Sequence, residues 1–378
     1  MRRKEPHLFW QLLVVALSAL VLLLFIGNYR VNLAKLNIET GFGFLEDTAG
    51  FAISPKLISY DESSSYFRAY QVGLLNTLLV TVLAVTLATV LGLLIALARL
   101  SKNNWLLQKL AYGYTEMFRN IPPLLHVLFW YQVFFLRILP KEALVFFRHI
   151  YLNIRGLTVP AWQWKPFGIW LFLAVLVFLV LGFWLLGRYR RNQRRLGQFR
   201  NYWPWQLGIL ATACIAFFAA QPYTLLYPET GRFGFTQGFT VTPELISIVV
   251  ALSSYSAVYI SEAIRSSVEA VPKGQSEAAR SLGLKRSLYM RLIILPQALR
   301  TVIPPVISQY LNILKNSSLG VVIAYPDLVS VFSGSTLNQV GRALEIIFMT
   351  MLTYLMISIA ISFIMNRYNK YLLSRGGV

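Results

Sequence analysis

The chain has 378 residues, of which 56% are hydrophobic and 13% are charged, whereas a soluble domain carries about 25% charged residues. Its mean hydropathy of +0.57 excludes an ordinary soluble protein. The formal net charge of +20 would suit a nucleic-acid-binding protein, but basic residues in short loops beside apolar segments orient a membrane protein instead. We therefore expect a chain that contacts membrane lipid and has no nucleic-acid partner.

The N-terminal segment places Arg2, Arg3 and Lys4 before an apolar run, residues 8–26. A secretory signal peptide has the same order, but its apolar region is shorter and a small-residue cleavage site follows it. Here the run is long and ends in Gly-Asn-Tyr-Arg at residues 27–30. We predict a first membrane span that is retained.

Eight apolar segments approach the roughly 20 residues that a helix needs to cross a bilayer. Two of them are expected to be irregular, because Pro122-Pro123 and Pro304-Pro305 interrupt the hydrogen-bond ladder of a helix. In a membrane such breaks are tolerated where protein or a wet cavity satisfies the freed backbone groups, so they hint at an internal pathway. The predicted fold class is an all-α polytopic membrane protein with spans at residues 8–27, 70–98, 106–136, 167–187, 205–223, 243–264, 301–325 and 343–365.

The basic residues predict an orientation. If the N-terminus is cytoplasmic, the cytoplasmic segments hold about twice as many Lys and Arg residues as the opposite side, which is the usual bias of membrane proteins. Both termini are then cytoplasmic. The strongest anchor is the run Arg-Tyr-Arg-Arg-Asn-Gln-Arg-Arg at residues 188–195. We interpret it as a topology signal beside anionic headgroups, with a dedicated lipid or protein site as the alternative.

The spans differ in polarity. The second, third, sixth, seventh and eighth carry polar residues and proline breaks, whereas the first, fourth and fifth are almost wholly apolar and suit lipid-facing helices. We expect a five-helix core, one added N-terminal helix and a two-helix insertion. The predicted parts are residues 1–69 (first helix and external segment), 70–136 (first part of the core), 137–242 (insertion with a basic cytoplasmic loop) and 243–378 (second part of the core).

A long cytoplasmic loop, residues 268–296, separates the sixth and seventh expected spans. It predicts two short helices joined by a turn, because Pro272 suits a first helical turn and Gly283 can take the positive φ that ends a helix. Ala278 and Ala279 form a small-residue patch that another protein can approach closely. Nothing in this loop has the chemistry of a catalytic site.

The loop also carries a family signature. Glu277, Ala278 and Ala279 are followed after three residues by Gly283, and nine residues later by Ile-Ile-Leu-Pro at 293–296. This pattern resembles the signature loop of binding-protein-dependent ABC importer permeases at every fixed position. The resemblance implies a type I importer fold in which the loop is the coupling helix that docks on the ATPase. It assigns the ATPase-coupling role to Glu277, Ala278, Ala279 and Gly283.

Other stretches resemble the polar amino-acid group of this family. The long insertion is similar to that of the general L-amino-acid permeases, which pair two unlike membrane subunits. Asn316-Ser317 departs from the family, which commonly has Asp-Thr there and so carries a carboxylate that this chain lacks. The resemblance rests on residues 73–78, 114–125, 259–265, 271–279 and 314–319.

The resemblance implies a set of partners. These are a second permease subunit in a heterodimer, two copies of a cytoplasmic ABC ATPase, a periplasmic or surface-attached binding protein, and an amino-acid substrate, all at a bacterial inner membrane. The chain has no Gly-rich phosphate loop ending in Gly-Lys-Ser or Gly-Lys-Thr, so we expect ATP and Mg²⁺ on the ATPase, no cofactor on this chain and no catalysis by it. The lone Cys214 lies in an apolar run and predicts neither a disulfide nor a metal cluster.

Polar residues inside spans are costly and usually functional. A bound amino acid needs donors for its carboxylate, such as Lys315 or Arg119, and acceptors for its ammonium, such as Glu262 or Glu116. The alternatives are local pairing of Glu116 with Arg119 and of Glu262 with Arg265. Gln309, Asn312 and Asn316 share one helix face, which could line a cavity or pack against another helix. The candidate pathway residues are Glu116, Arg119, Asn120, Glu262, Gln309, Asn312, Lys315 and Asn316.

The predicted function is the permease subunit of an ATP-driven importer for polar L-amino acids. The alternative is a secondary transporter driven by an ion gradient, which leaves the Glu-Ala-Ala loop without a purpose. A membrane-embedded enzyme has little support, because His7, His126 and His149 are scattered and no nucleophile sits beside a base. An export or scaffold subunit is a further alternative.

Overall fold

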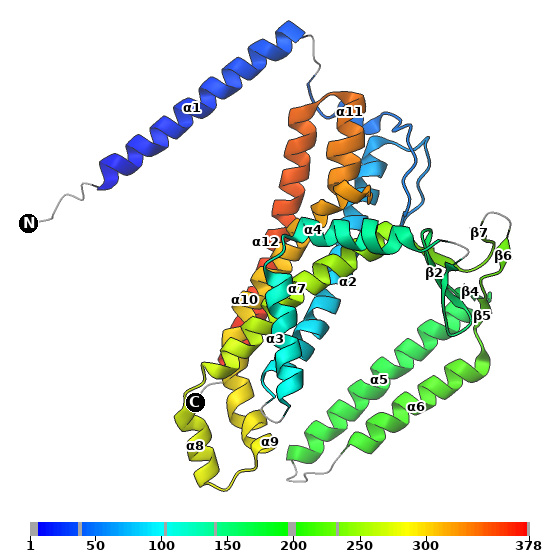
Figure 1. Ribbon diagram of the computed structural model, residues 1–378, viewed down its shortest axis with the longest axis vertical. Helices are drawn as coiled ribbons and strands as arrows, with labels where there is room; N and C mark the ends of the chain where they lie inside the picture. Colours follow the sequence, from blue (N-terminus) through cyan, green and yellow to red (C-terminus); the bar gives the residue numbers. More distant parts are fainter. Residues whose placement is uncertain are drawn as a thin grey trace, which may run out of the picture. The chain divides into compact units, whose positions relative to one another are not determined.

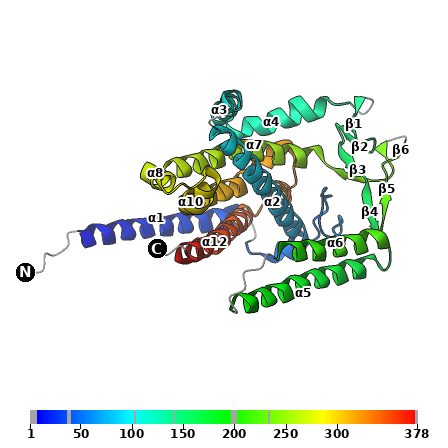
Figure 2. The same ribbon diagram turned by 90° about the horizontal axis from the view of Figure 1, so that it is seen from below.

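The computed structural model describes residues 7–36, 40–101, 104–139, 142–195, 202–231 and 234–375, and Figures 1 and 2 show it from two sides. Its contacts divide the chain into two compact units, one formed by residues 1–131 and 247–378 and the other by residues 132–246. Seven of the helices in the described part are long and apolar enough to cross a membrane. The prediction of a helical polytopic membrane protein is confirmed.

The first unit is helical. Short 3-10 or π-helical segments, η1, η5, η6 and η7, connect or extend its helices at Gly43–Glu46, Met290–Ile294, Ser317–Ile323 and Val329–Thr336. Its helices, together with α7, which starts at the boundary of the second unit, are α1 (His7–Leu36), α2 (Tyr66–Arg99), α3 (Trp105–Arg119), α4 (Pro123–Leu128), α7 (Pro243–Glu269), α8 (Lys273–Ser281), α9 (Arg286–Tyr289), α10 (Leu295–Asn316), α11 (Leu337–Val340) and α12 (Ala343–Arg375).

The two proline pairs behave differently. The expected span at residues 106–136 is divided at Pro122-Pro123 into α3 and α4, so it is not one of the seven long helices. In contrast, α10 continues through Pro304 and Pro305, against our expectation of a break there. Each proline removes one backbone donor, but its fixed φ is close to that of a helix. The seventh span becomes irregular only later, in η6.

Small residues let α2 approach its neighbours closely. Ala84, Ala88, Gly92 and Ala96 are buried at a spacing of four residues and therefore lie along one face of the helix. A Cβ atom added at Gly92 would lie 2.7 Å from Cγ2 of Ile260 on α7. Membrane helices pack through such small-residue faces because lipid offers no hydrophobic driving force between them.

The segment of residues 40–65, which precedes α2, packs onto the helices of the first unit. Phe44 and Tyr60 are buried in a cluster that also contains Phe332 of η7 and Ile346 of α12. The backbone of Gly41 is held at both of its polar groups, since its N–H donates to Glu345 Oε1 at 2.9 Å and its carbonyl accepts from Arg342 at 2.8 Å. Residues 40–65 are thus part of the core packing and not a free linker.

The second unit combines a helical hairpin with small sheets. Helices α5 (Gly168–Arg195) and α6 (Trp203–Ala220) pack against each other and run side by side in both views (Figures 1 and 2). All strand pairs are antiparallel. One sheet has the order β1-β2-β3-β8 (Leu144–Phe146, Ile150–Asn153, Gly156–Val159, Phe239–Val241), and β4 pairs with β5 (Ala161–Trp164, Tyr223–Leu226) and β6 with β7 (Thr230–Gly231, Gly234–Phe235).

These strands are the part of the fold that we did not expect. Each has at most four residues, too few for alternation of polar and apolar residues to be recognised. A signal was nevertheless present at residues 153–156, where Asn153 and Gly156 pair across a two-residue turn and Gly156 has a φ of +118°. Glycine tolerates this conformation because it has no Cβ atom.

The close contact of α2 with α7 yields a prediction. Gly92→Ala should lower the free energy of unfolding by about 1–3 kcal/mol, because its Cβ would overlap the stiff β-branched Ile260. Gly113→Ala is the matched control on α3, since a Cβ at Gly113 meets nothing within 4 Å. Thermal unfolding of both purified variants in detergent measures the difference. Equal midpoints would contradict close packing at Gly92.

Candidate functional site

The loop between α7 and α10 has the predicted helix–turn–helix geometry. Helix α8 begins after Pro272 and ends at Ser281, Leu282 is its C-cap residue, and Gly283 follows with a φ of +72°. The N–H of Leu284 donates to the carbonyl of Ala279 at 3.1 Å, and the N–H of Gly283 donates to that of Arg280 at 2.9 Å. These two bonds form a Schellman motif, which fixes the exit direction of the chain from a helix. The expected glycine turn is confirmed.

The side chains of this loop separate into an anchored side and an open side. Ala279 is buried, and α8 packs against α9 and η5, the segments that follow it. Glu277, Ala278 and Gly283 are exposed. Leu282, a large apolar residue next to the glycine turn, is 78% exposed. The loop therefore presents a rigid surface of mixed charge and apolarity.

One face of α10 is polar and open. Asn312 and Lys315 are exposed, whereas Gln309 and Asn316 are half-buried beside them. The exposed positions recur every three or four residues and so lie on a single side of the helix. Ile307, Ile313 and Leu314 are buried on another side. The open stripe consists of Thr301, Pro305, Ser308, Asn312 and Lys315.

Glu262 is held in an ion-pair network near the end of α7. Its carboxylate accepts from Arg99 of α2 at 2.5 Å and also from Arg265, and Arg265 in turn pairs with Glu269. The Arg99 side chain is only 14% exposed, so this pair is shielded from water more than a surface pair. The predicted pairing of Glu262 with Arg265 is present, and Arg99 is an additional partner from another helix.

Glu116, Arg119 and Asn120 lie together at the end of α3. Arg119 Nη2 lies 2.9 Å from Glu116 Oε1, and Asn120 Nδ2 donates to the carbonyl of Glu116 at 2.8 Å. These contacts satisfy polar groups just before the break at Pro122-Pro123. The structure thus contains the local pair that we considered for Glu116 and Arg119.

The candidates therefore form separate groups: the α8 loop, the α10 face, the Glu262 network and the end of α3. The end of α3 and the α10 face are linked indirectly. Helix α4 follows the α3 group along the chain, η6 follows the α10 face, and α4 packs against η6. In the part of the chain that the structure describes, no three His, Cys, Asp or Glu side chains meet as ligands for a metal ion.

Two residues that take part in these groups, Arg99 and His126, were not predicted from the sequence. Arg99 is the first basic residue after the second span, and such a position is typical of a topology signal, so nothing indicated its bond to Glu262. His126 stacks on Phe118 with ring centroids 5.0 Å apart and lies 5.7 Å from the ring of Tyr255. An isolated histidine after a proline pair gave no sign of this aromatic stack across the break.

Residues 88–375 match the family described as "Binding-protein-dependent transport system inner membrane component". The chain is 47% identical to the "Putative amino-acid ABC transporter permease protein YhdX" of Escherichia coli (strain K12), covering 96% of this chain and 93% of the relative. It is 42% identical to the "General L-amino acid transport system permease protein AapQ" of Rhizobium johnstonii, covering 97% and 92%.

A third relative is the "Glutamate/glutamine/aspartate/asparagine transport system permease protein BztB" of Rhodobacter capsulatus, which is 37% identical over 95% of this chain and 92% of its own length. All three relatives therefore align along the insertion as well as the core. The family match extends from within α2 to the end of α12. The chain belongs to the family of membrane-spanning, inner-membrane components of binding-protein-dependent transport systems.

Proposed function

We propose that this chain is the permease subunit of an ATP-driven importer for polar L-amino acids. It forms the translocation pathway with a second, unlike permease subunit and is itself not catalytic. The substrate class is supported by the names of three full-length relatives, which are described as permeases for amino acids. The observation that carries the mechanism is the rigid α8 loop with its exposed, partly apolar surface.

The α8 loop is suited to transmit movement from an ATPase. A docking element must keep its shape under load, and the Schellman motif at Gly283 and the packing of α8 against η5 provide this. It must also leave side chains free for the partner, as Glu277, Ala278 and Leu282 are. Two copies of a cytoplasmic ABC ATPase, which bind ATP and Mg²⁺, would close and open around this loop and its counterpart.

The open face of α10 is suited to line the pathway. Polar side chains are expensive in contact with lipid and normally face protein or water, so this stripe faces either the second permease or an aqueous route. Lys315 offers an ammonium to the substrate carboxylate, and Asn312 offers an amide that both donates and accepts. The Asn316 amide stands where related permeases commonly have a carboxylate, which leaves recognition of the substrate ammonium to other groups or to the partner subunit.

The orientation follows from the same proposal. If α8 meets a cytoplasmic ATPase, both termini are cytoplasmic. The sheets of the second unit then lie on the outer side, together with the start of α5 and the end of α6, which they adjoin in the sequence. A periplasmic or surface-attached binding protein would deliver the amino acid to that side of a bacterial inner membrane.

Reconstitution with the co-purifying subunits tests the whole proposal: polar amino acids with their binding protein should stimulate ATP hydrolysis. Uptake that persists without ATP but follows a proton gradient would instead indicate a secondary transporter.

Gly283→Asp should abolish ATP-dependent uptake while membrane insertion stays intact, because a side chain at φ +72° strains the turn and its carboxylate adds charge to the docking surface. Gly341→Asp is the matched control. Gly341 also follows a helix and has a φ of +73°, but it lies outside the loop. Uptake of labelled amino acid into proteoliposomes measures both variants. If Gly341→Asp were as inactive as Gly283→Asp, or if Gly283→Asp transported normally, the docking role would be wrong.

Lys315→Ala should raise the KM for uptake about tenfold, the effect of losing one hydrogen bond to a charged group. Lys315→Arg keeps the charge, so its KM for uptake should stay close to that of the unchanged protein. Lys56→Ala, at an exposed lysine of the external segment, controls for loss of a positive charge elsewhere. Unchanged kinetics in Lys315→Ala would mean that this face of α10 packs against another helix.

A further inference from the structure

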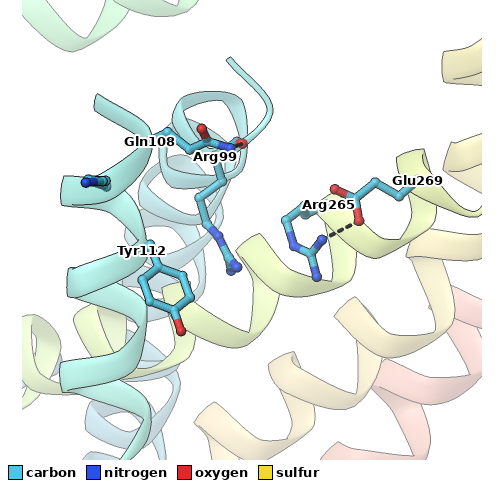
Figure 3. A pocket seen from close by; sticks show the side chains of 6 residues that line it. Arg99, Gln108, Tyr112, Arg265 and Glu269 are labelled. Atoms are coloured by element: carbon cyan, nitrogen blue, oxygen red, sulfur yellow. Dashed lines mark hydrogen bonds and ion pairs between the residues drawn. The ribbon is translucent and has the colours of Figure 1, made fainter. Parts of the chain in front are cut away.

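A polar pocket of about 260 Å³ lies where α2, α3 and α7 come together beside the α8 loop (Figure 3). Its lining residues are Arg99, Gln108, Lys109, Tyr112, Arg265 and Glu269. We propose that this pocket binds the phosphate headgroup of an anionic phospholipid. The proposal goes beyond transport itself and concerns a separate site on the same subunit.

The pocket lies at the boundary between hydrocarbon and water. The apolar segments of α2 and α7 end at Arg99 and Glu269, and both of these residues line the pocket. In Figure 3 the Arg99 side chain extends between the helix that carries Gln108 and Tyr112 and the helix that carries Arg265. A phospholipid in the adjacent leaflet has its phosphate at this depth.

The charges of the pocket favour an anion. Three cations line it, and its one carboxylate, Glu269, is already paired with Arg265. Arg99 directs one guanidinium nitrogen to Glu262, which leaves further N–H donors of its planar group for a phosphate. Lys109 has no carboxylate partner among the described residues, and its ammonium lies 5.1 Å from the ring centroid of Trp105.

The residues of α3 that neighbour the pocket residues in the sequence favour a lipid over a free ion. Trp105, Leu106 and Leu110 are 67%, 53% and 64% exposed on α3, next to the lining residues Gln108 and Lys109. Tryptophan is typical of the membrane interface, and exposed leucines are suited to contact acyl chains. If Lys109 and Arg99 hold the phosphate of a lipid, the acyl chains of that lipid would extend into the hydrocarbon layer along these side chains. Basic pockets between membrane helices bind anionic headgroups in this manner.

A lipid at this position would touch the ion pairs that join α2 to α7. Arg99 and Arg265 line the pocket and also hold Glu262, and α7 leads directly into the α8 loop through residues 270–272. Occupation of the pocket would thus stabilise the helix junction from which the loop projects. This stabilisation is the quantity to measure, and the measurement needs no transport.

The test uses the full chain in the complex with which it purifies, delipidated in detergent. Dioleoylphosphatidylglycerol is titrated in, and the thermal midpoint and the number of retained lipids by native mass spectrometry are recorded, with dioleoylphosphatidylcholine as the zwitterionic comparison. We expect phosphatidylglycerol alone to raise the midpoint, because a ligand stabilises the folded state that binds it. Lys109→Gln should weaken the apparent affinity about tenfold, and Lys109→Arg should restore it.

Arg155→Gln is the matched control, since it removes one positive charge from an exposed position in the turn between β2 and β3, away from the pocket residues in the sequence. It should bind phosphatidylglycerol as the unchanged protein does. Equal loss in Arg155→Gln and Lys109→Gln would show a general attraction to basic residues and overturn the site. Equal stabilisation by phosphatidylcholine, or full saturation of the site by inorganic phosphate alone, would overturn the assignment to an anionic lipid.

Discussion

The small-residue face of α2 is the constraint on which the first unit depends. Polar backbone segments can exist at membrane depth only when protein satisfies their hydrogen bonds, and the face of α2 allows neighbouring backbones to come close enough for this. At Gly73 an added Cβ would lie 3.0 Å from Cα of Leu328. One turn further, Thr77 Oγ1 accepts the N–H of Leu328 at 3.0 Å. A larger residue at position 73 would separate these groups.

The same region of α2 holds the irregular chain that follows α10. Asn76 Nδ2 donates to the carbonyls of Pro55 and Pro326, both at 2.9 Å, and Tyr325 donates to the carbonyl of Asn76 at 3.1 Å. One amide thereby connects the segment of residues 40–65 with the turn after η6. The irregular geometry of residues 317–336, which belong to no α-helix, is possible because α2 supplies polar partners at the depth where water is scarce.

The sequence was most informative where a local conformation decides the structure. Gly283 specifies a left-handed residue after a helix, and the structure has that turn with its two hydrogen bonds. The apolar spans were recognisable because length and hydrophobicity alone determine them. The course of α10 through Pro304 and Pro305 was not recognisable, since the tolerance of a helix for missing donors depends on its surroundings. Arg99 could not be assigned to Glu262, 163 positions away, because no local pattern encodes a pair between two helices.

The candidate pathway residues were likewise predictable where local spacing decides their position, and not where packing between helices decides it. Spacing placed Gln309, Asn312 and Asn316 on one side of a helix, and the structure adds that Thr301, Ser308 and Lys315 share the open part of that side. Which side of a helix is covered depends on the positions of its neighbours, and these follow from packing across the whole unit. For Glu116 and Glu262 the local spacing was sufficient, because their arginines lie three residues away on the same helix.

The sheet of the second unit has a consequence for synthesis of the chain. Strand β3 pairs with β8 from Leu157↔Val241 to Val159↔Phe239, and both membrane helices of the hairpin are made between these two strands. The edge of β3 therefore stays open while the ribosome completes α5 and α6 and the translocation machinery inserts them. Open strand edges are sites of mispairing, so the time needed to insert this hairpin sets how long the nascent chain is vulnerable. Strands of three or four residues limit that risk, because each offers few backbone groups to a wrong partner.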